Sequence, residues 1–199
     1  MLTDAIGIRK VVGIAGSLRR GSFSRRVLDA AASELPAQVS LEIWDGLARV
    51  PPFSEDVESG PEPLAVTELR KIIRHADGLL IATPEYNGSI PGQLKNALDW
   101  ASRPRGEAAL EGKPVSTLSA SPTPYGGSRA LADLRRVLTV IHAEIRGEEI
   151  SVPHIHEQFD IHGRLLDDEL RGRLQTLLAA LAEPATAAGR TAQLAVTAS

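Results

Sequence analysis

A loop at residues 16–24, with the sequence Gly-Ser-Leu-Arg-Arg-Gly-Ser-Phe-Ser, carries side chains of the types that bind phosphate groups. Ser17, Ser22 and Ser24 offer hydroxyl donors. Arg19 adds a guanidinium whose fork of N–H groups matches two phosphate oxygens. The glycines let backbone N–H groups turn toward an anion, and a helix that begins at the end of the loop adds a partial positive charge. The loop therefore has the composition of a phosphate site.

The spacing of the glycines limits which phosphate this loop would bind. It lacks the Gly-Lys-Ser/Thr of a nucleotide P-loop and the G-x-G-x-x-G spacing of dinucleotide folds. These absences favour a monophosphate ester. A serine- and glycine-rich turn with a helix-capping serine has the same composition, however, and the loop alone leaves the two interpretations about equal.

Two later segments also follow apolar runs and carry side chains suited to a ligand. Residues 83–91 (Thr-Pro-Glu-Tyr-Asn-Gly-Ser-Ile-Pro) bring an aromatic ring, a side-chain amide and backbone amides, which suit the edge and face of a flat heterocycle. Residues 121–127 (Ser-Pro-Thr-Pro-Tyr-Gly-Gly) end in two glycines that allow a ligand to approach the backbone closely. We expect both loops to lie beside the first.

Apolar runs and helical spacings predict the elements that hold these loops. Strands are predicted at residues 11–15, 39–44, 78–82 and 115–120, with a fifth within 144–152. Apolar side chains recur at helical spacing in residues 27–35, 69–76, 91–101, 131–141 and 166–181, and proline and glycine mark a loop at 51–63. Strands that alternate with helices form a parallel sheet covered on both faces. Ligands of such sheets bind at the carboxyl ends of the strands, where the three loops would meet.

Length and composition bound the remaining possibilities. The 199 residues suffice for one core of ordinary size, and we expect a single domain at residues 1–183 followed by a tail at 184–199. The net charge of -3 gives no general attraction for nucleic acid or anionic membranes, and the absence of cysteine excludes disulfides and thiolate metal sites. Residues 1–10 lack a secretory-signal pattern, and no apolar stretch reaches the ~18 residues of a membrane span. We therefore expect a cytoplasmic protein that does not insert into membranes.

The chain resembles the NADPH-dependent FMN reductases, a family that includes quinone, azo-dye and chromate reductases. Three segments carry the resemblance in the same order along the chain. Residues 16–24 resemble the phosphate loop of the family, and residues 121–127 resemble its segment Ser-Pro-Gly-x-x-Gly-Gly. The most distinctive match is Pro-Glu-Tyr-Asn-Gly-Ser-Ile-Pro-Gly-Gln-Leu-Lys-Asn-Ala-Leu-Asp-Trp at residues 84–100. The similarity runs from about Lys10 to Leu181.

The resemblance implies an α/β, flavodoxin-like three-layer sandwich with a five-stranded parallel sheet of order 2-1-3-4-5. It implies FMN as the cofactor, NADPH or NADH as the hydride donor, and assembly as a homodimer or homotetramer. No metal is expected, because no carboxylate or cysteine completes a familiar ligand pattern with His154, His156 and His162. The residues implied to bind FMN are Ser17, Arg19, Ser22, Phe23, Ser24, Pro84, Glu85, Tyr86, Asn87, Ser121, Gly126 and Gly127. Two positions depart from the family pattern: Ser24 replaces an asparagine of many members, and Thr123 replaces the usual glycine.

The implied activity is that of an oxidoreductase that passes hydride from a nicotinamide to bound FMN and then to a quinone, a free flavin or a similar acceptor. Both substrates would use the same face of the flavin, which predicts ping-pong kinetics. FMN itself carries the electron transfer, so no catalytic side chain is required, although Glu85 could donate a proton to a reduced quinone.

Two alternatives keep the cofactor and change the function: a flavodoxin-like electron carrier, and an FMN-binding protein without turnover. A carrier usually presents a strongly acidic docking face, whereas this chain has 25 acidic and 22 basic residues. This balance favours the reductase.

Several side chains near the predicted site have a plainer interpretation. Arg19, Arg20, Arg25 and Arg26 cluster near the predicted site, and an arginine that FMN leaves free would favour the extra phosphate of NADPH. Arg25 and Arg26 are individually expected to be solvated helix charges. Trp100 is expected in the core or at an interface, and Tyr125 is expected in loop packing or at an interface as readily as at a ligand.

Overall fold

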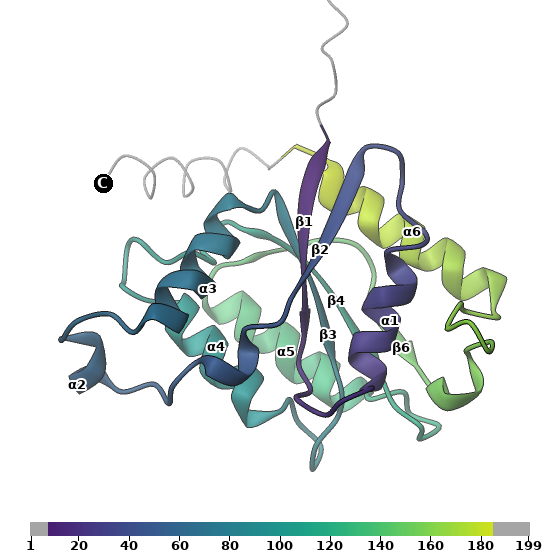
Figure 1. The fold of residues 1–199 in the computed structure, drawn as a ribbon, viewed down its shortest axis with the longest axis horizontal. Helices are drawn as coiled ribbons and strands as arrows, with labels where there is room; N and C mark the ends of the chain where they lie inside the picture. Colours follow the sequence, from purple (N-terminus) through teal and green to yellow (C-terminus); the bar gives the residue numbers. More distant parts are fainter. Residues whose placement is uncertain (1–7, 185–199) are drawn as a thin grey trace, which may run out of the picture.

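The computed structural model describes residues 8–184, which form a layered α/β domain (Figure 1). Within this range six strands make one sheet, and all paired strands run parallel. The strands are β1 (Arg9–Ala15), β2 (Val39–Trp44), β3 (Gly78–Thr83), β4 (Pro114–Ala120), β5 (Glu144–Ile145) and β6 (Ile150–Val152). Their order is β2-β1-β3-β4-β5, with β6 also paired to β4, so the predicted order is confirmed and one strand is added.

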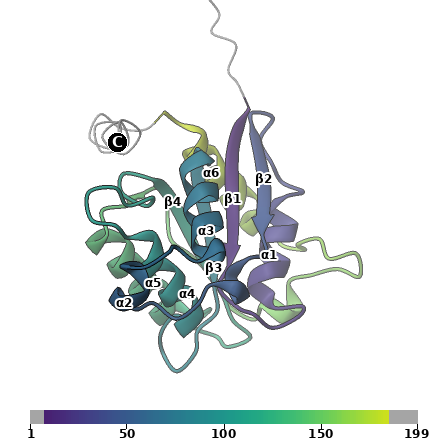
Figure 2. The same ribbon diagram turned by 60° about the vertical axis from the view of Figure 1, so that its left-hand side comes forward.

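Helices cover both faces of the sheet (Figures 1 and 2). The helices are α1 (Phe23–Ala31), α2 (Glu55–Glu58), α3 (Leu64–His75), α4 (Gly92–Ala101), α5 (Ser128–Val140) and α6 (Asp168–Ala182), with 3-10 turns at η1 (Leu47–Arg49) and η2 (Ile155–Glu157). Helices α3, α4 and α5 pack on one face, and α1 and α6 pack on the other. Each face buries its own hydrophobic core, as a three-layer sandwich requires.

The central strand β3 shows why the sequence builds these layers. Leu79 and Ile81 pack into the core under α3, α4 and α5, while Leu80 and Ala82 pack into the core under α1 and α6. Successive side chains of a strand point to opposite faces, so a strand buried on both faces reads as a continuous apolar run. All residues of β3 are buried, whereas the edge strand β2 is partly exposed.

The predicted fifth strand is divided in two, which corrects the expectation of five strands. β5 pairs with the beginning of β4 and β6 with its end. Between them Gly147 has a φ of 70°, which interrupts the extended backbone. The side chain of Arg146 turns toward the end of α6, donating to the carbonyls of Ala180, Glu183 and Pro184 at 3.2, 2.7 and 3.0 Å. Arg146 thus binds carbonyls at and just beyond the end of α6 that the helix leaves unpaired.

Three predicted boundaries also differ from the structure. Helix α1 ends at Ala31 and does not reach Leu35, because the chain tightens into a turn in which the Glu34 N–H donates to the Ala31 carbonyl at 3.0 Å. Leu166 lies before α6 and is exposed, since Asp167 caps that helix through the N–H groups of Glu169 and Leu170. The predicted loop at residues 51–63 contains the short helix α2, which begins after Ser54.

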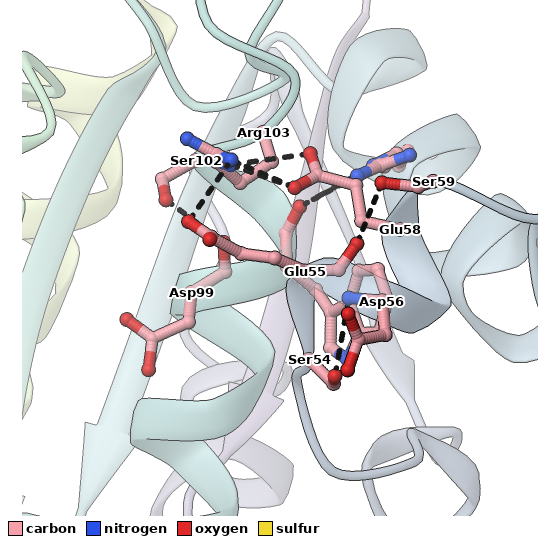
Figure 3. A network of polar contacts seen from close by, with 10 residues as sticks. Ser54, Glu55, Asp56, Glu58, Ser59, Asp99, Ser102 and Arg103 are labelled. Atoms are coloured by element: carbon pink, nitrogen blue, oxygen red, sulfur yellow. Dashed lines mark hydrogen bonds and ion pairs between the residues drawn. The ribbon is translucent and has the colours of Figure 1, made fainter.

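Hydrogen bonds and ion pairs connect the segment that contains α2 to the end of α4 (Figure 3). Arg103 donates to both carboxylate oxygens of Glu58 at distances between 2.8 and 3.1 Å, and it also lies 3.6 Å from Glu55. The indole N–H of Trp100 donates to the Pro51 carbonyl at 2.8 Å. Trp100 is fully buried, which confirms its expected place in the core.

No helix within residues 8–184 has the length and apolar character needed to cross a membrane. The predicted tail at 184–199 lies, apart from Pro184, outside the described residues.

Candidate active site

The loops that follow β1, β3 and β4 come together at the carboxyl ends of these strands, at the lower end of the sheet in Figures 1 and 2. They enclose a cleft of about 200 Å³. Its lining consists of Ser17, Arg19, Ser22, Phe23, Ser24, Pro84, Glu85, Tyr86, Ala120, Ser121 and Pro122. Parallel neighbouring strands place their following loops at one edge, so residues about a hundred positions apart in sequence share this cleft.

The beginning of α1 contributes two buried serines to the cleft. The hydroxyl of Ser22 caps the helix by accepting from the N–H of Arg25 at 3.3 Å. Ser24 is fully buried, and its hydroxyl has no hydrogen-bond partner. A buried polar atom without a partner costs about 1–3 kcal/mol, and a ligand in the cleft that supplied the missing bond would remove this cost. Together with the positive end of the helix dipole, Ser24 makes this part of the cleft suited to an anion.

Arg19 supplies the positive side chain of the cleft. Its guanidinium carbon lies 5.5 Å from the centre of the Phe23 ring, and it donates to the carbonyl of Arg20 at 3.5 Å. Among residues 8–184 it forms no ion pair with a carboxylate. Its charge is therefore available to an anion bound at the beginning of α1.

The second loop is held as a tight turn against the first. Tyr86 and Ser89 exchange backbone hydrogen bonds of 2.9 and 3.1 Å, and the two residues between them, Asn87 and Gly88, have φ values of 53° and 79°. The hydroxyl of Tyr86 lies 2.9 Å from that of Ser17, so the ring spans the two loops. Tyr86 lines the cleft, whereas Asn87, which was also predicted to bind FMN, lies in the turn and is not among the lining residues.

Glu85 joins the second loop to the third. Its carboxylate accepts hydrogen bonds from the backbone N–H groups of Arg129 and Ala130, at 3.2 and 3.4 Å. These groups lie in the first turn of α5, whose own N-cap residue is Gly127 and offers no side chain. The carboxylate thus acts as a helix cap supplied from another loop.

A second bond strengthens this connection. The hydroxyl of Ser89 donates to the carboxylate of Asp133 in α5 at 2.6 Å. This hydrogen bond, together with one from Arg136, holds the pKa of Asp133 below its usual value, so the carboxylate is charged at neutral pH.

The two glycines of the third loop, which were predicted to bind FMN, do not line the cleft. Gly126 and Gly127 have φ values of 61° and 81°. A Cβ on Gly126 would lie 2.9 Å from the Val152 carbonyl carbon, and one on Gly127 would lie 3.2 Å from Cβ of Ser119. Their conformation brings the chain close to neighbouring strands and turns it into α5.

The part of the third loop that lines the cleft is Ala120 to Pro122. Ser121 accepts from the Thr123 N–H at 3.2 Å, and the two side-chain hydroxyls lie 3.0 Å apart, so Thr123 stabilises the loop in place of the usual glycine. Ala120 and Pro122 were not among the predicted residues. Their only sequence signal is that they flank Ser121.

Arg25 and Arg26 are more constrained than the expected solvated charges. Arg25 pairs with Asp29 at 2.9 Å and also with Asp45. The guanidinium of Arg26 lies 4.0 Å from the centre of the Phe159 ring, where cation and ring attract each other. Both arginines therefore support the packing around α1. Tyr125 is 73% exposed and does not line the cleft.

The chain matches known proteins over most of its length. Residues 9–157 match the model of the family described as NADPH-dependent FMN reductase. An NAD(P)H-dependent FMN reductase of Pseudomonas aeruginosa is 43% identical over 173 residues, which cover 86% of this chain and 92% of that protein. A 2-hydroxy-1,4-benzoquinone reductase of a Burkholderia species is 37% identical over 170 residues, which cover 85% of this chain and 92% of that protein.

A solved structure shares the fold. The flavoenzyme NAD(P)H:(acceptor) oxidoreductase FerB of Paracoccus denitrificans superimposes with a TM-score of 0.79 at 28% identity, covering 88% of this chain and 96% of that one. The fold, the order of the three loops and the match over residues 9–157 agree with one another. The chain belongs to the NADPH-dependent FMN reductase family.

Proposed function

We propose that the protein is an NAD(P)H-dependent, FMN-containing oxidoreductase that reduces a quinone, a free flavin or a similar acceptor in a ping-pong reaction. The observation that carries this proposal is the cleft at the carboxyl ends of β1, β3 and β4, where the buried hydroxyl of Ser24 has no partner. The cleft occurs in a chain whose relatives include proteins named FMN reductase and quinone reductase.

The residues of the cleft fit FMN. Ser22, Ser24, Arg19 and the first turn of α1 would hold its phosphate, because they combine hydroxyl donors, a cation and a helix N-terminus. The loops at residues 84–86 and 120–122 would border the flavin ring. When bound, FMN supplies the hydride and electron transfer.

The protein would contribute position and environment. The hydroxyl of Tyr86 is fixed by Ser17, so its ring has a defined place at the mouth of the cleft, where it is 48% exposed. Glu85 would hold the second loop in place through α5 and would not act as a proton donor, because its carboxylate is engaged with the N–H groups of Arg129 and Ala130.

The charges around the cleft favour a reductase over an electron carrier. Arg19, which lines the cleft, and Arg20 in the same loop form no ion pair among residues 8–184, so two cationic side chains of this loop are free to attract an anion. Such a surface suits an anionic dinucleotide, whereas carriers dock through acidic faces. Assembly as a homodimer or homotetramer and a place in the cytoplasm remain part of the proposal. The exposed rings of Tyr86 and Tyr125 support an interface near the cleft.

An anaerobic titration of the purified protein tests the function. The protein is expected to be yellow or to take up added FMN. NADPH should bleach the flavin absorbance, and a quinone should restore it. A protein that holds FMN but is not bleached by NADPH or NADH would be a carrier or a binding protein, and one that takes up no FMN would contradict the proposal.

A further inference from the structure

The first loop separates the cleft from a second hollow of about 350 Å³ on its outer side. Ser17, Arg19 and Ser22 line both, so the two spaces lie on either side of these residues. The far wall of the second hollow is the chain that leaves β2, at Trp44 and Leu47. We call this hollow the β2 groove. An elongated ligand that occupies the mouth of the cleft at one end can extend over the first loop into it.

The wall of the β2 groove is aromatic and apolar. The indole of Trp44 lies directly over Gly46, where an added Cβ would be 2.1 Å from ring carbon Cζ2. Only glycine leaves room for the ring in this position, so the sequence Trp-Asp-Gly places an indole at the end of β2. Leu18 also lines the groove and is 54% exposed. A flat heterocycle such as a purine binds well between surfaces of this kind.

One arginine that lines only the β2 groove has no carboxylate partner. Arg25 is engaged by the carboxylates of Asp29 and Asp45, and this pairing also balances the acid that lines the groove. Arg19 lies over Phe23 and faces the cleft as well. Arg20 lines only the groove and forms no ion pair within the described part of the chain. A guanidinium without an acidic partner beside an aromatic wall suits a phosphate ester of a nucleoside.

We propose that the β2 groove binds the adenosine 2′-phosphate end of NADPH, with Arg20 contacting the 2′-phosphate and Trp44 supporting the adenine. This inference rests on the proposed function, because that function requires a nicotinamide dinucleotide at the neighbouring cleft. NADH has the same adenine but lacks the 2′-phosphate. Arg20 therefore distinguishes the two donors, while Trp44 contacts a part that both share.

Steady-state kinetics of Arg20→Ala test the role of the arginine. The loss of a charge-assisted contact should raise the KM for NADPH about tenfold or more, whereas the KM for NADH should change less than about twofold. Arg20→Lys should retain part of the preference. Arg105→Ala is the matched control, because Arg105 is exposed and lines neither hollow, and it should leave both KM values unchanged. Equal changes for the two donors with Arg20→Ala would overturn the inference.

Calorimetric titration of the oxidised FMN-loaded protein tests the groove without turnover. Adenosine 2′,5′-bisphosphate should bind about tenfold more tightly than adenosine 5′-monophosphate, and Arg20→Ala should abolish that difference. Trp44→Leu should weaken the binding of both nucleotides.

The outcomes separate this inference from the proposed function. If the bisphosphate binds through Arg20 but neither NADPH nor NADH bleaches the flavin, the groove is supported and the proposed reductase function fails. If both donors bleach the flavin but the two nucleotides bind equally in wild-type protein, the reductase stands and the groove is refuted.

Discussion

The carboxylate of Glu85 lies 3.2 Å from the backbone nitrogen of Arg129, across the boundary between the second loop and helix α5. Glu85 follows β3, while Arg129 belongs to the helix that follows β4. The bond therefore sets the distance between two loops that border the cleft, and it satisfies a donor that the helix cannot pair internally.

Replacing Glu85 tests whether this bond supports the cofactor site. Glu85→Ala should lower the free energy of unfolding by about 1 kcal/mol, as the loss of a helix cap does, and it should weaken FMN binding because the second loop is no longer held. Glu85→Gln keeps an accepting oxygen and should restore most of both properties. Urea unfolding and fluorescence titration with FMN measure them. Full FMN affinity in Glu85→Ala would show that the loop is positioned by other contacts.

Ser24→Ala should affect the free and the FMN-loaded protein in opposite directions. Without FMN the substitution removes a buried hydroxyl that has no partner, so the free energy of unfolding should stay the same or rise by about 1 kcal/mol. FMN affinity should fall about tenfold, because the phosphate loses a donor.

Ser22→Ala is the matched control for Ser24. It removes the cap of α1 and should destabilise the free protein by about 1 kcal/mol. Thermal unfolding with and without FMN separates the two cases. A Ser24→Ala protein that is clearly destabilised without FMN would contradict the view of an unsatisfied hydroxyl.

Arg19→Ala should weaken FMN retention by about ten- to a hundredfold, because a doubly charged phosphate loses its cationic partner. Arg19→Lys should restore part of the affinity, since the charge remains but the paired N–H groups do not. Equilibrium dialysis at two salt concentrations measures the FMN affinity of both variants. Unchanged affinity in Arg19→Ala would remove this residue from the phosphate site.

Lys113 makes the stability of the folded protein depend on pH in the alkaline range. The side chain is buried at the end of α3, where it donates to the Ala76 carbonyl at 2.6 Å, and burial lowers its pKa to about 8. In the unfolded chain the lysine keeps its proton up to a pKa near 10.5. Between these values the unfolded state binds more protons than the folded state, so the contribution of this group to stability grows as the pH rises.

The pH-dependent part of this contribution is at most about 3–4 kcal/mol, because folding lowers the pKa from 10.5 to about 8 and each pKa unit corresponds to about 1.4 kcal/mol. Urea unfolding of wild-type protein and of Lys113→Met, at several pH values between 8 and 10.5, measures the contribution of Lys113 to the free energy of unfolding. Lys71→Met, which removes an exposed lysine, is the control. The difference in stability between wild type and Lys113→Met should change across this window. A difference that stays constant with pH would contradict the lowered pKa.

Local sequence predicted the elements best where local patterns decide the structure. The apolar run of β3 and the helical spacing of α3 need no knowledge of distant residues, and both were found. The division of the last strand at Gly147 was missed, and the neighbouring Arg146 contacts the end of α6, more than thirty residues away. No pattern in residues 144–152 reports that contact.

The candidate site shows the same limit. Ser22 and Ser24 were placed correctly in the cleft, because a serine-rich loop before a helix has a local meaning. Asn87, Gly126 and Gly127 do not line the cleft, and their positive φ values form turns and close backbone contacts, so their contact with FMN stays a prediction. The role of Glu85 as a cap for α5 depends on the packing of two loops and could not be predicted from either one.

A crystal structure of the FMN-loaded protein is the most direct test of the cleft as the cofactor site. We predict that a phosphate oxygen of FMN lies within about 2.5–3.0 Å of the Ser24 hydroxyl, with the guanidinium of Arg19 beside it and the flavin ring between the second and third loops. A phosphate bound away from α1, with the hydroxyl of Ser24 still unpartnered, would contradict the account.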